Sequence, residues 1–360
     1  MSALVDTLVL PDLPVLRLRL TLRLLTDARL PAYKGAMLRG GFGYAFQRAS
    51  CLQECWGRSH ECAITLICPY RWVFETPHPA DVAHLHDLRD VPRPFVIEPP
   101  DDGRTQYADG EALEFGLTLI GRGMEYLPYF LFSFEQLGRM GLGRDHTPFR
   151  LERVEALRPW QPTGVVVYQD GQVLKSSEPL PSIDAAAIAA RAQALPDRVH
   201  LRLQTPLRIR ERGDILRTFD LPALIRAASW RIDALSTFHG SGRWQVDHLR
   251  LIDAAQAVTV EQTQIRWLDL QRTSTRQRQT MPQGGIVGTV TLRGVGAELR
   301  ALLTLGSLVH VGKASTFGHG GLKVEGAPRV ERRVTVLLVK GRSYAQPDPR
   351  AFADAILRRE

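Results

Sequence analysis

The sequence predicts an α+β fold built from two ferredoxin-like units in tandem. Two stretches carry this prediction, V-L-R-L-R-L-T-L-R-L at 15–24 and V-H-L-R-L-Q-T-P-L-R-I at 199–209, in which apolar and polar residues alternate. A period of two is typical of a strand with one buried face. Each stretch opens a series of strand, helix, strands, helix and strand, which is the order of a βαββαβ unit. The two series resemble each other in pattern rather than in identity.

The first predicted domain covers residues 1–195. Its expected elements are strands at 15–24, 112–120, 149–157 and 164–174 and helices at 33–49, 126–140 and 182–195. The last of these strands is expected to turn back at Asp170-Gly171, a dipeptide that favours a hairpin turn. Pro196 follows the alanine-rich third helix, so we place the domain boundary there.

The second predicted domain covers residues 196–360 and repeats the series. Its expected strands lie at 199–209, 258–270, 285–293, 322–325 and 333–340, and its expected helices at 221–238, 246–257, 297–309 and 348–359. A glycine-rich loop at 312–321 joins the third helix to the next strand. The chain of 360 residues is long enough for two modest cores, since 44% of its residues are hydrophobic.

Excess positive charge is confined to the second predicted domain. Residues 1–195 hold 20 Lys and Arg against 23 Asp and Glu, a balance of −3, whereas residues 196–360 hold 26 against 15, a balance of +11. Such asymmetry is typical of proteins that bind nucleic acid or another anionic surface, and a solvated basic face is the alternative. The basic residues lie on strand-like and loop-like stretches, so an amphipathic membrane-binding helix is not expected.

The expected location is the cytoplasm. No run of 18 or more apolar residues occurs, which argues against a transmembrane helix. The N-terminal stretch M-S-A-L-V-D-T-L-V-L lacks the basic region of a signal peptide. We therefore expect no membrane partner.

All four cysteines lie within one window of eighteen residues, with the spacing C-x3-C-x6-C-x5-C. Structural disulfides are not expected in a reducing cytoplasm. Four thiolates suit a structural zinc ion, and an iron–sulfur cluster or four buried reduced thiols are the alternatives. His60 could replace one sulfur. The predicted metal ligands of this cysteine-rich insertion, at about 51–104, are Cys51, Cys55, Cys62 and Cys68.

Two neighbouring features indicate an anionic ligand. The first is an arginine cluster within thirteen residues, opposed by Asp269 alone, whose members are Arg266, Arg272, Arg276 and Arg278. The second is the glycine-rich loop G-K-A-S-T-F-G-H-G-G. Glycines let backbone N–H groups approach an anion closely, although a tight connection between two buried elements would read the same way. The loop matches neither a Walker A nor a dinucleotide-binding motif. Because the arginine cluster lies next to the loop, we expect a long anionic chain, which we take to be RNA.

These motifs resemble a known family. The sequence reads W-x-D-x-x-R-x-S-x-R-Q from Trp267, then G-G-x-V-G from Gly284, then L-x-x-L-G-x-L-V-H-V-G-K-x-S-T-F-G-x-G at 302–320. This order is similar to that of the CRISPR repeat-processing endoribonucleases of the RAMP superfamily. The resemblance covers roughly the last hundred residues closely and the first half loosely. The loop departs from the family pattern at His319, where an apolar residue would be commoner.

The resemblance implies two ferredoxin-like (RAMP or RRM-like) domains and cleavage of CRISPR precursor RNA within its repeats to give crRNA. The implied reaction needs no metal or other cofactor, and it leaves 2′,3′-cyclic phosphate and 5′-hydroxyl ends. A non-catalytic RAMP subunit that holds RNA in a CRISPR effector complex is the alternative. The expected partners are therefore CRISPR repeat RNA or crRNA and, in a complex, other effector subunits.

The RNA-binding residues are expected in the arginine cluster, in the loop and just after it. They are Arg272, Arg276, Arg278, Gly312, Lys313, Ser315, Thr316, Gly318, His319, Gly320, Gly321 and Lys323. The arginines and Lys313 should contact phosphates, and the loop N–H groups should hold the backbone near the cut.

The catalytic residues follow from what the reaction requires, which is a base, an acid and charge stabilisation. In the family the base is often a histidine near the first helix, but 33–49 contains none. We expect His239 to act as the base, because it precedes a glycine turn and should be accessible. A helix-capping role for this histidine is the alternative. Tyr33, Lys34 and Arg39 are expected to position the phosphate and stabilise charge.

Overall fold

The structure is a computed structural model that describes residues 8–51, 53–55, 68–76, 85, 88, 91–175, 178–274 and 279–327. The described residues belong to one compact unit, Met1–Ala327. The strand expected at 333–340 and the helix expected at 348–359 lie outside the described residues.

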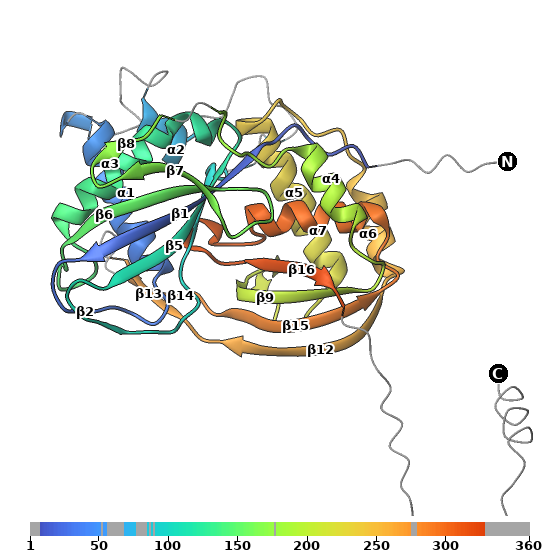
Figure 1. The fold of residues 1–360 in the computed structure, drawn as a ribbon. Coiled ribbons are helices and arrows are strands. Elements are labelled where there is room, and N and C mark those ends of the chain that lie inside the picture. The colour runs from blue at the N-terminus through green and yellow to red at the C-terminus, as the bar shows by residue number, and fades with distance from the viewer. Residues whose placement is uncertain are drawn as a thin grey trace, which may run out of the picture. The chain divides into compact units, whose positions relative to one another are not determined.

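The first half contains a six-stranded antiparallel sheet with the strand order β3-β5-β1-β6-β7-β8 (Figure 1). Its strands are β1 (Val15–Leu24), β3 (Phe95–Glu98), β5 (Ala112–Ile120), β6 (Phe149–Leu157), β7 (Gly164–Gln169) and β8 (Gln172–Val173). The first four form the ferredoxin-like order, and the hairpin β7–β8 extends the sheet beyond β6. A separate short pairing joins β2 (Ala28–Arg29) to β4 (Gln106–Tyr107).

Three helices of the first half pack on one face of this sheet (Figure 1). They are α1 (Gly35–Ser50), α2 (Pro69–Phe74) and α3 (Leu127–Met140), with 3-10 turns η1 (Gln53–Cys55) and η4 (Gly121–Tyr126). The core between them is aromatic. The ring of Phe42 stacks on those of Phe130 and Phe134 at centroid distances of 5.0 and 4.7 Å and meets Phe95 edge-on at 5.6 Å. These contacts join α1, α3 and β3. The next helix along the chain, α4 (Ala185–Gln193), packs instead against α7 (Ala297–Val309) of the second half.

The second half contains a four-stranded antiparallel sheet with the order β12-β15-β9-β16, again ferredoxin-like. Its strands are β9 (Val199–Leu207), β12 (Thr259–Leu268), β15 (Gly285–Arg293) and β16 (Leu322–Gly326), and its helices are α5 (Leu221–His239), α6 (His248–Gln256), α7 (Ala297–Val309) and the 3-10 turn η5 (Ser315–Phe317). Two hairpins complete it, β10 (Arg210–Glu211) with β11 (Asp214–Ile215), and β13 (Gln271–Ser274) with β14 (Gln279–Pro282).

Local signals explain where the helices begin. The carboxylates of Asp184, Asp220 and Asp247 each accept a backbone N–H at the N-terminus of α4, α5 and α6. At the other end of α7, the fully buried guanidinium of Arg231 donates to the carbonyl oxygens of Val309 and His310. This contact joins α5 to α7 and satisfies carbonyls that the helix itself leaves unpaired.

The predicted α+β class and the two ferredoxin-like units are confirmed. In β1 the leucines are buried while Arg17, Arg19 and Arg23 remain partly exposed, as the alternation predicted. The sequence analysis missed β3, a four-residue strand inside a proline-rich stretch, and α2. The chain passes from α4 to β9 around Pro196, and the domain boundary proposed there stays a prediction. Part of the predicted cysteine-rich insertion at about 51–104 lies outside the described residues, and the insertion stays a prediction.

Candidate nucleic-acid interface

The glycine-rich loop at 312–321 is held tightly against the end of β9. The hydroxyl of Thr205 donates to the carbonyl oxygen of Gly318 at 2.6 Å and accepts the N–H of Gly321 at 2.8 Å. The N–H of Lys313 donates to the carbonyl oxygen of Arg208 at 2.9 Å, and the N–H of Gly320 donates to the carbonyl oxygen of Pro206 at 3.0 Å. The N–H groups of Lys313, Gly320 and Gly321 are therefore used by the protein itself, and the predicted role of the loop in holding RNA stays a prediction.

The loop also touches the first half. The hydroxyl of Tyr33, just before α1, donates to the carbonyl oxygen of Phe317 at 2.8 Å. A Cβ at Gly35 would overlap the same carbonyl group, and a Cβ at Gly318 would overlap Pro99 beyond β3. Gly35 and Gly318 therefore serve the close approach of the loop to residues of the first half.

Two arginines lie against the ring of Phe317. The guanidinium of Arg272, in β13, is 4.3 Å from the ring centroid, and that of Arg39, in α1, is 5.5 Å away. Arg39 also lies over Phe74 at 4.5 Å and Phe95 at 5.4 Å. Burial lowers the pKa of Arg272, although a guanidinium keeps its charge at neutral pH. The structure thus brings two of the predicted residues, one from each half, to one aromatic side chain.

Arg208 was not predicted, and it supports both the loop and the hairpin. Its guanidinium donates to the carbonyl oxygens of Gly284 and, at 3.1 Å, of Pro282, at the base of the hairpin β13–β14. Its own carbonyl oxygen accepts the N–H of Lys313. The sequence offered a weak signal, since Arg208 continues the polar face of β9, which carries Arg202, past a proline.

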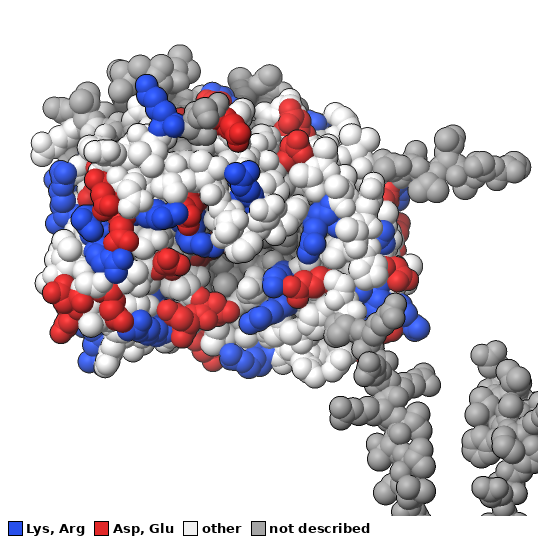
Figure 2. Space-filling view, viewed as in Figure 1, with Lys and Arg blue, Asp and Glu red and all other residues white. Residues whose placement is uncertain are grey.

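The basic side chains around the loop differ from those of the first half. On the left of Figure 2, over the first half, Lys and Arg side chains alternate with Asp and Glu. Ion pairs account for this pattern, among them Arg17–Glu98 at 2.9 Å, Arg19–Glu155 at 3.6 Å and Arg23–Glu152 at 2.5 Å. Within the described part of the chain, Arg208, Arg272 and Lys313 have no carboxylate within ion-pair distance. Their charge therefore stays available to an anion.

The remaining predicted RNA-binding residues fall into four groups. Lys313 and Lys323 are exposed, and Lys323 pairs with Glu325 at 2.6 Å. Ser315, Thr316, Gly318, His319, Gly320 and Gly321 are buried, so the expectation that they contact RNA directly is wrong for this conformation. Gly312 is half-buried with a φ of +94°. Arg276 and Arg278 lie outside the described residues.

His319 is buried and neutral. Its Nε2 lies within hydrogen-bond distance of Oε1 of Gln283, at 3.2 Å, and the amide oxygen accepts from Nε2 in the tautomer that carries the proton there. Burial, together with the nearby Arg208 and His310, lowers the pKa of His319 to about 3. Nδ1 of His310 in turn donates to the carbonyl oxygen of His319 at 3.0 Å. Both imidazoles fix the loop, and the sequence analysis missed the part that Gln283 takes.

His239 is also enclosed. It ends α5 with 2% of its surface exposed, and its Nε2 donates to the carbonyl oxygen of Pro92 at 2.7 Å. Burial lowers its pKa to about 4. The expectation that His239 is accessible is therefore wrong, because the connection to β3 covers the end of the helix.

Lys34 and Tyr33 are occupied by the protein itself. The ammonium of Lys34 is fully buried and donates to the carboxylate of Asp102 at 3.1 Å and to the carbonyl oxygen of Arg104 at 2.7 Å. Burial raises the pKa of Tyr33, whose hydroxyl donates a hydrogen bond to the carbonyl oxygen of Phe317. The expectation that Lys34 positions a phosphate is wrong in this conformation, because its three donors face protein oxygens.

Three of the four cysteines are described. Burial, and then the neighbouring thiols of Cys68 and Cys55, raises the pKa of the Cys51 thiol to about 12. The Cys51 thiol, at the end of α1, therefore lies near those of Cys68, at the start of α2, and of Cys55, in η1. Cys62 and His60 lie outside the described residues. Within the described ranges, no group of three or more His, Cys, Asp or Glu side chains is arranged to hold a metal ion.

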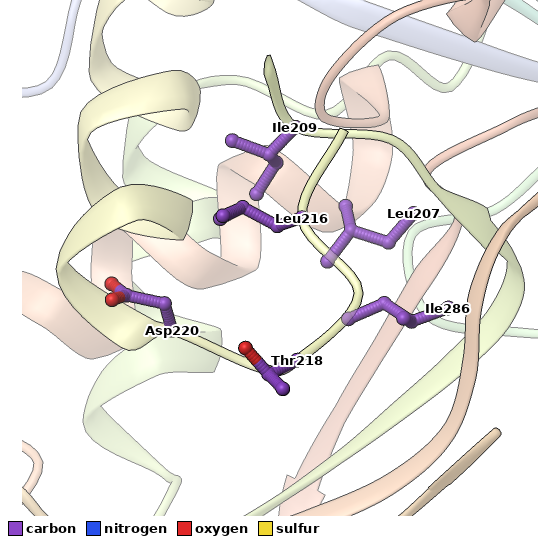
Figure 3. Close-up of a pocket in the computed structure, with 6 residues that line it drawn as sticks. All are labelled: Leu207, Ile209, Leu216, Thr218, Asp220 and Ile286. Carbon is purple, nitrogen blue, oxygen red and sulfur yellow. The ribbon is translucent and has the colours of Figure 1, made fainter. Parts of the chain in front are cut away.

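A small pocket elsewhere does not resemble a catalytic site. It lies between the end of β9, the start of α5 and β15, and it is lined by Leu207, Ile209, Leu216, Thr218, Asp220 and Ile286 (Figure 3). The acid, Asp220, already caps α5. The pocket therefore offers no acid that is available for catalysis.

No helix among the described residues is long and apolar enough to cross a membrane.

Two comparisons of the sequence with known proteins cover much of the chain. A protein of Archaeoglobus fulgidus, described as uncharacterized, is 24% identical over 301 residues, which are 82% of this chain and 92% of that protein. Residues 13–180 match an N-terminal domain family named AF_1859_N.

Solved structures share the fold at low identity. A partial Cas6-RT-Cas1–Cas2 complex matches 88% of this chain with a TM-score of 0.54 and 16% identity. The match spans only 46% of that complex's chain. A Cas6 product complex matches 86% of this chain and 98% of its own, with a TM-score of 0.51 and 17% identity. Thermus thermophilus Cas6 matches 87% of this chain and 98% of its own, with a TM-score of 0.50 and 16% identity.

A family model also matches part of the second half. Residues 201–322, which run from β9 to the first residue of β16, match the family described as CRISPR-associated endoribonuclease Cas6. This match includes the hairpin β13–β14, the glycine-rich loop, Arg208 and Arg272. Over these residues the chain is similar to the Cas6 family.

Proposed function

We propose that this chain is an endoribonuclease that binds CRISPR repeat RNA at the glycine-rich loop and the hairpin β13–β14 and cleaves it. The observation that carries the proposal is the charge of this surface. Arg208, Arg272 and Lys313 have no carboxylate partner in the described part of the chain, whereas the arginines of β1 do. A polyanion is the partner that such a surface favours. The match of residues 201–322 to the family described as CRISPR-associated endoribonuclease Cas6 supports repeat RNA as that polyanion.

The proposed chemistry is an internal transesterification. The 2′-oxygen gives its proton to a base and bonds to the adjacent phosphorus, while the bond from phosphorus to the 5′-oxygen breaks and this oxygen takes up a proton. The products carry a 2′,3′-cyclic phosphate and a 5′-hydroxyl. Each proton transfer is typically worth about 10²–10⁴ in rate. No step needs a metal ion, because fixed cations can stabilise the charge of the phosphorane.

Arg39 is the predicted catalytic residue whose position suits this role best. It lies in α1, and its guanidinium faces Phe317 of the loop at 5.5 Å and Phe74 at 4.5 Å. A cation held between aromatic rings has few conformations to lose when a phosphate arrives. We therefore propose that Arg39 stabilises the phosphorane together with Arg272.

A labelled repeat RNA tests the proposal. Purified protein is incubated with this RNA in EDTA, and the ends of any product are analysed. A single cut with a cyclic phosphate end is the expected result. Loss of cleavage on chelation would contradict the metal-independent chemistry, and failure to retain the RNA even in dilute buffer would contradict the whole proposal.

A second function, that of a non-catalytic RNA-binding subunit, is favoured by one observation. The histidines described near the loop, His310 and His319, are buried, and so is His239. Each has a pKa lowered by burial, which leaves it a weak base. Retention of repeat RNA without cleavage in the same assay would support this function. The likeness to a chain of a Cas6-RT-Cas1–Cas2 complex supports protein partners under either proposal.

We also propose that Cys51, Cys55, Cys62 and Cys68 hold one structural zinc ion. The proximity of the Cys51 thiol to those of Cys68 and Cys55 supports this proposal. Three donors from the end of α1, η1 and the start of α2 would need the fourth cysteine to complete a tetrahedral set. An iron–sulfur cluster is the alternative with the same ligands.

A further inference from the structure

We infer that Gln283 is a positioning residue for RNA, which fixes the place of Arg272 through His319 and Phe317 without touching the RNA itself. This inference rests on the proposed RNA binding. It concerns how the hairpin β13–β14 and the glycine-rich loop are held together.

The hairpin and the loop meet at two points. At the first, the guanidinium of Arg272 in β13 lies 4.3 Å from the ring centroid of Phe317 in the loop. At the second, Nε2 of His319, two residues further along the loop, donates to Oε1 of Gln283 at 3.2 Å. Gln283 directly follows β14, which pairs with β13. The two contacts therefore connect the hairpin and the loop at two separate positions.

The backbone on each side of Gln283 is fixed. Arg208 donates to the carbonyl oxygens of Pro282 and Gly284, and the N–H of Gln283 donates to Leu270 O at 2.7 Å. The Cα atom of Gln283 is therefore held in place at the base of the hairpin, and its side chain extends from there. A hydrogen bond from such a position can restrain its partner.

The partner is a neutral donor that cannot easily turn elsewhere. His319 is fully buried, and its Nδ1 has no hydrogen-bond partner in the described part of the chain. Its hydrogen bond to Gln283 orients the ring together with the contact to the ring of Tyr33, at a centroid distance of 5.1 Å. Without Gln283, the loop loses one of its two contacts with the hairpin. The side chains of Phe317 and Arg272 then gain conformational freedom, and RNA binding must order them again at a cost in affinity.

The test measures RNA affinity by fluorescence anisotropy in a double-mutant cycle. The variants are Gln283→Leu, Arg272→Ala and the two together, and the control is Gln264→Leu, an exposed glutamine on β12. We expect Gln283→Leu to weaken binding about three- to tenfold. In the Arg272→Ala background the same change should have less than about a twofold effect, because the restrained group is gone. Gln264→Leu should bind as the wild type does.

Each other outcome is decisive. If Gln283→Leu binds RNA as the wild type does, or if its effect is the same with and without Arg272, the inference is wrong and Gln283 serves stability alone. Should Gln283→Leu fail to fold, Gln283→Asn, which keeps the amide but shortens the side chain, takes its place in the cycle with the same expectations. Failure of the wild type to bind RNA would instead overturn the proposed function.

Discussion

The hydroxyl of Tyr33 donates a hydrogen bond to the carbonyl oxygen of Phe317, 284 positions later in the chain, at 2.8 Å. This contact joins the start of α1 to the glycine-rich loop. Gly35, two residues after Tyr33, lies so close to the same carbonyl group that it leaves no room for a side chain. The position of the loop, and with it of Phe317, therefore depends on residues of both halves.

We predict that Tyr33→Phe lowers the free energy of unfolding by about 1 kcal/mol, because one buried hydrogen bond is lost. RNA affinity should fall with it, since the loop is less restrained. Urea unfolding and RNA titration measure the two effects. The matched control is Tyr44→Phe, a change at an exposed tyrosine of α1. A drop in cleavage rate of about 10²–10⁴ at unchanged stability and affinity would instead assign Tyr33 to proton transfer.

A second prediction concerns Lys34, whose ammonium is buried against Asp102 and two carbonyl oxygens. Lys34→Met should lower the free energy of unfolding by about 1–3 kcal/mol, because charge-assisted hydrogen bonds are lost. Lys175→Met, at an exposed lysine, should change it by less than about 0.5 kcal/mol. Equal effects of the two substitutions would contradict the structural role of Lys34.

The same pair has a pH dependence with a defined sign. Burial raises the pKa of Asp102, but hydrogen bonds from the Arg104 N–H, Lys34 and Tyr107 outweigh this effect. They hold the pKa of Asp102 below its ordinary value. The stabilisation is therefore present above about pH 4, the unfolded value, and is lost as the pH falls through the folded one. The difference in stability between the wild type and Lys34→Met should shrink between pH 7 and pH 3, as measured by urea unfolding at each pH.

Tyr33 and Lys34 also show what the sequence could and could not predict. The alternation in β1 and β9 predicted two strands that begin two similar units, because one buried face imposes a period of two. The proximity of Tyr33 to the loop followed from family resemblance. Nothing local predicted that Lys34 would turn to Asp102, because long-range packing decides which lysine is buried.

The same limit applies to histidines. A glycine turn after His239 suggested an exposed side chain, but the connection that leads into β3 covers it through Pro92. This connection lies in a proline-rich stretch with no periodic pattern, and β3 itself has only four residues. Gln283 carried no motif at all. Its role depends on the position of His319, which is set by three-dimensional packing of the loop.

The third prediction is acid sensitivity caused by His239. Its folded pKa of about 4 lies below the ordinary value of about 6.5, so the unfolded chain binds more protons between these values. Stability is therefore highest above about pH 6.5 and falls as the pH drops toward 4, by about 3 kcal/mol for this group. His239→Gln, which does not titrate, should flatten this part of the stability curve in urea unfolding. An unchanged curve would contradict the buried neutral state.

The fourth prediction concerns the cysteines. If zinc is bound, purified protein should contain about one zinc per chain, as measured by atomic absorption. Cys51→Ser should lose the metal and lower the melting temperature, because the end of α1 and the start of α2 would no longer be joined. A brown protein with iron in place of zinc would support the iron–sulfur alternative. Protein free of both metals would contradict the proposed site.

The fifth prediction separates free from paired arginines. Arg272 has no carboxylate partner among the described residues, whereas Arg19 lies 3.6 Å from Glu155. A phosphate contact by Arg272 releases counterions, so Arg272→Ala should weaken RNA binding and reduce the salt dependence of log K by about one unit of slope. Arg19→Ala should leave the slope nearly unchanged, because its charge is already balanced by a carboxylate of the sheet. RNA affinity measured over a series of salt concentrations gives both slopes. Equal slopes for the two variants would mean that RNA follows the face of the first sheet instead of the loop.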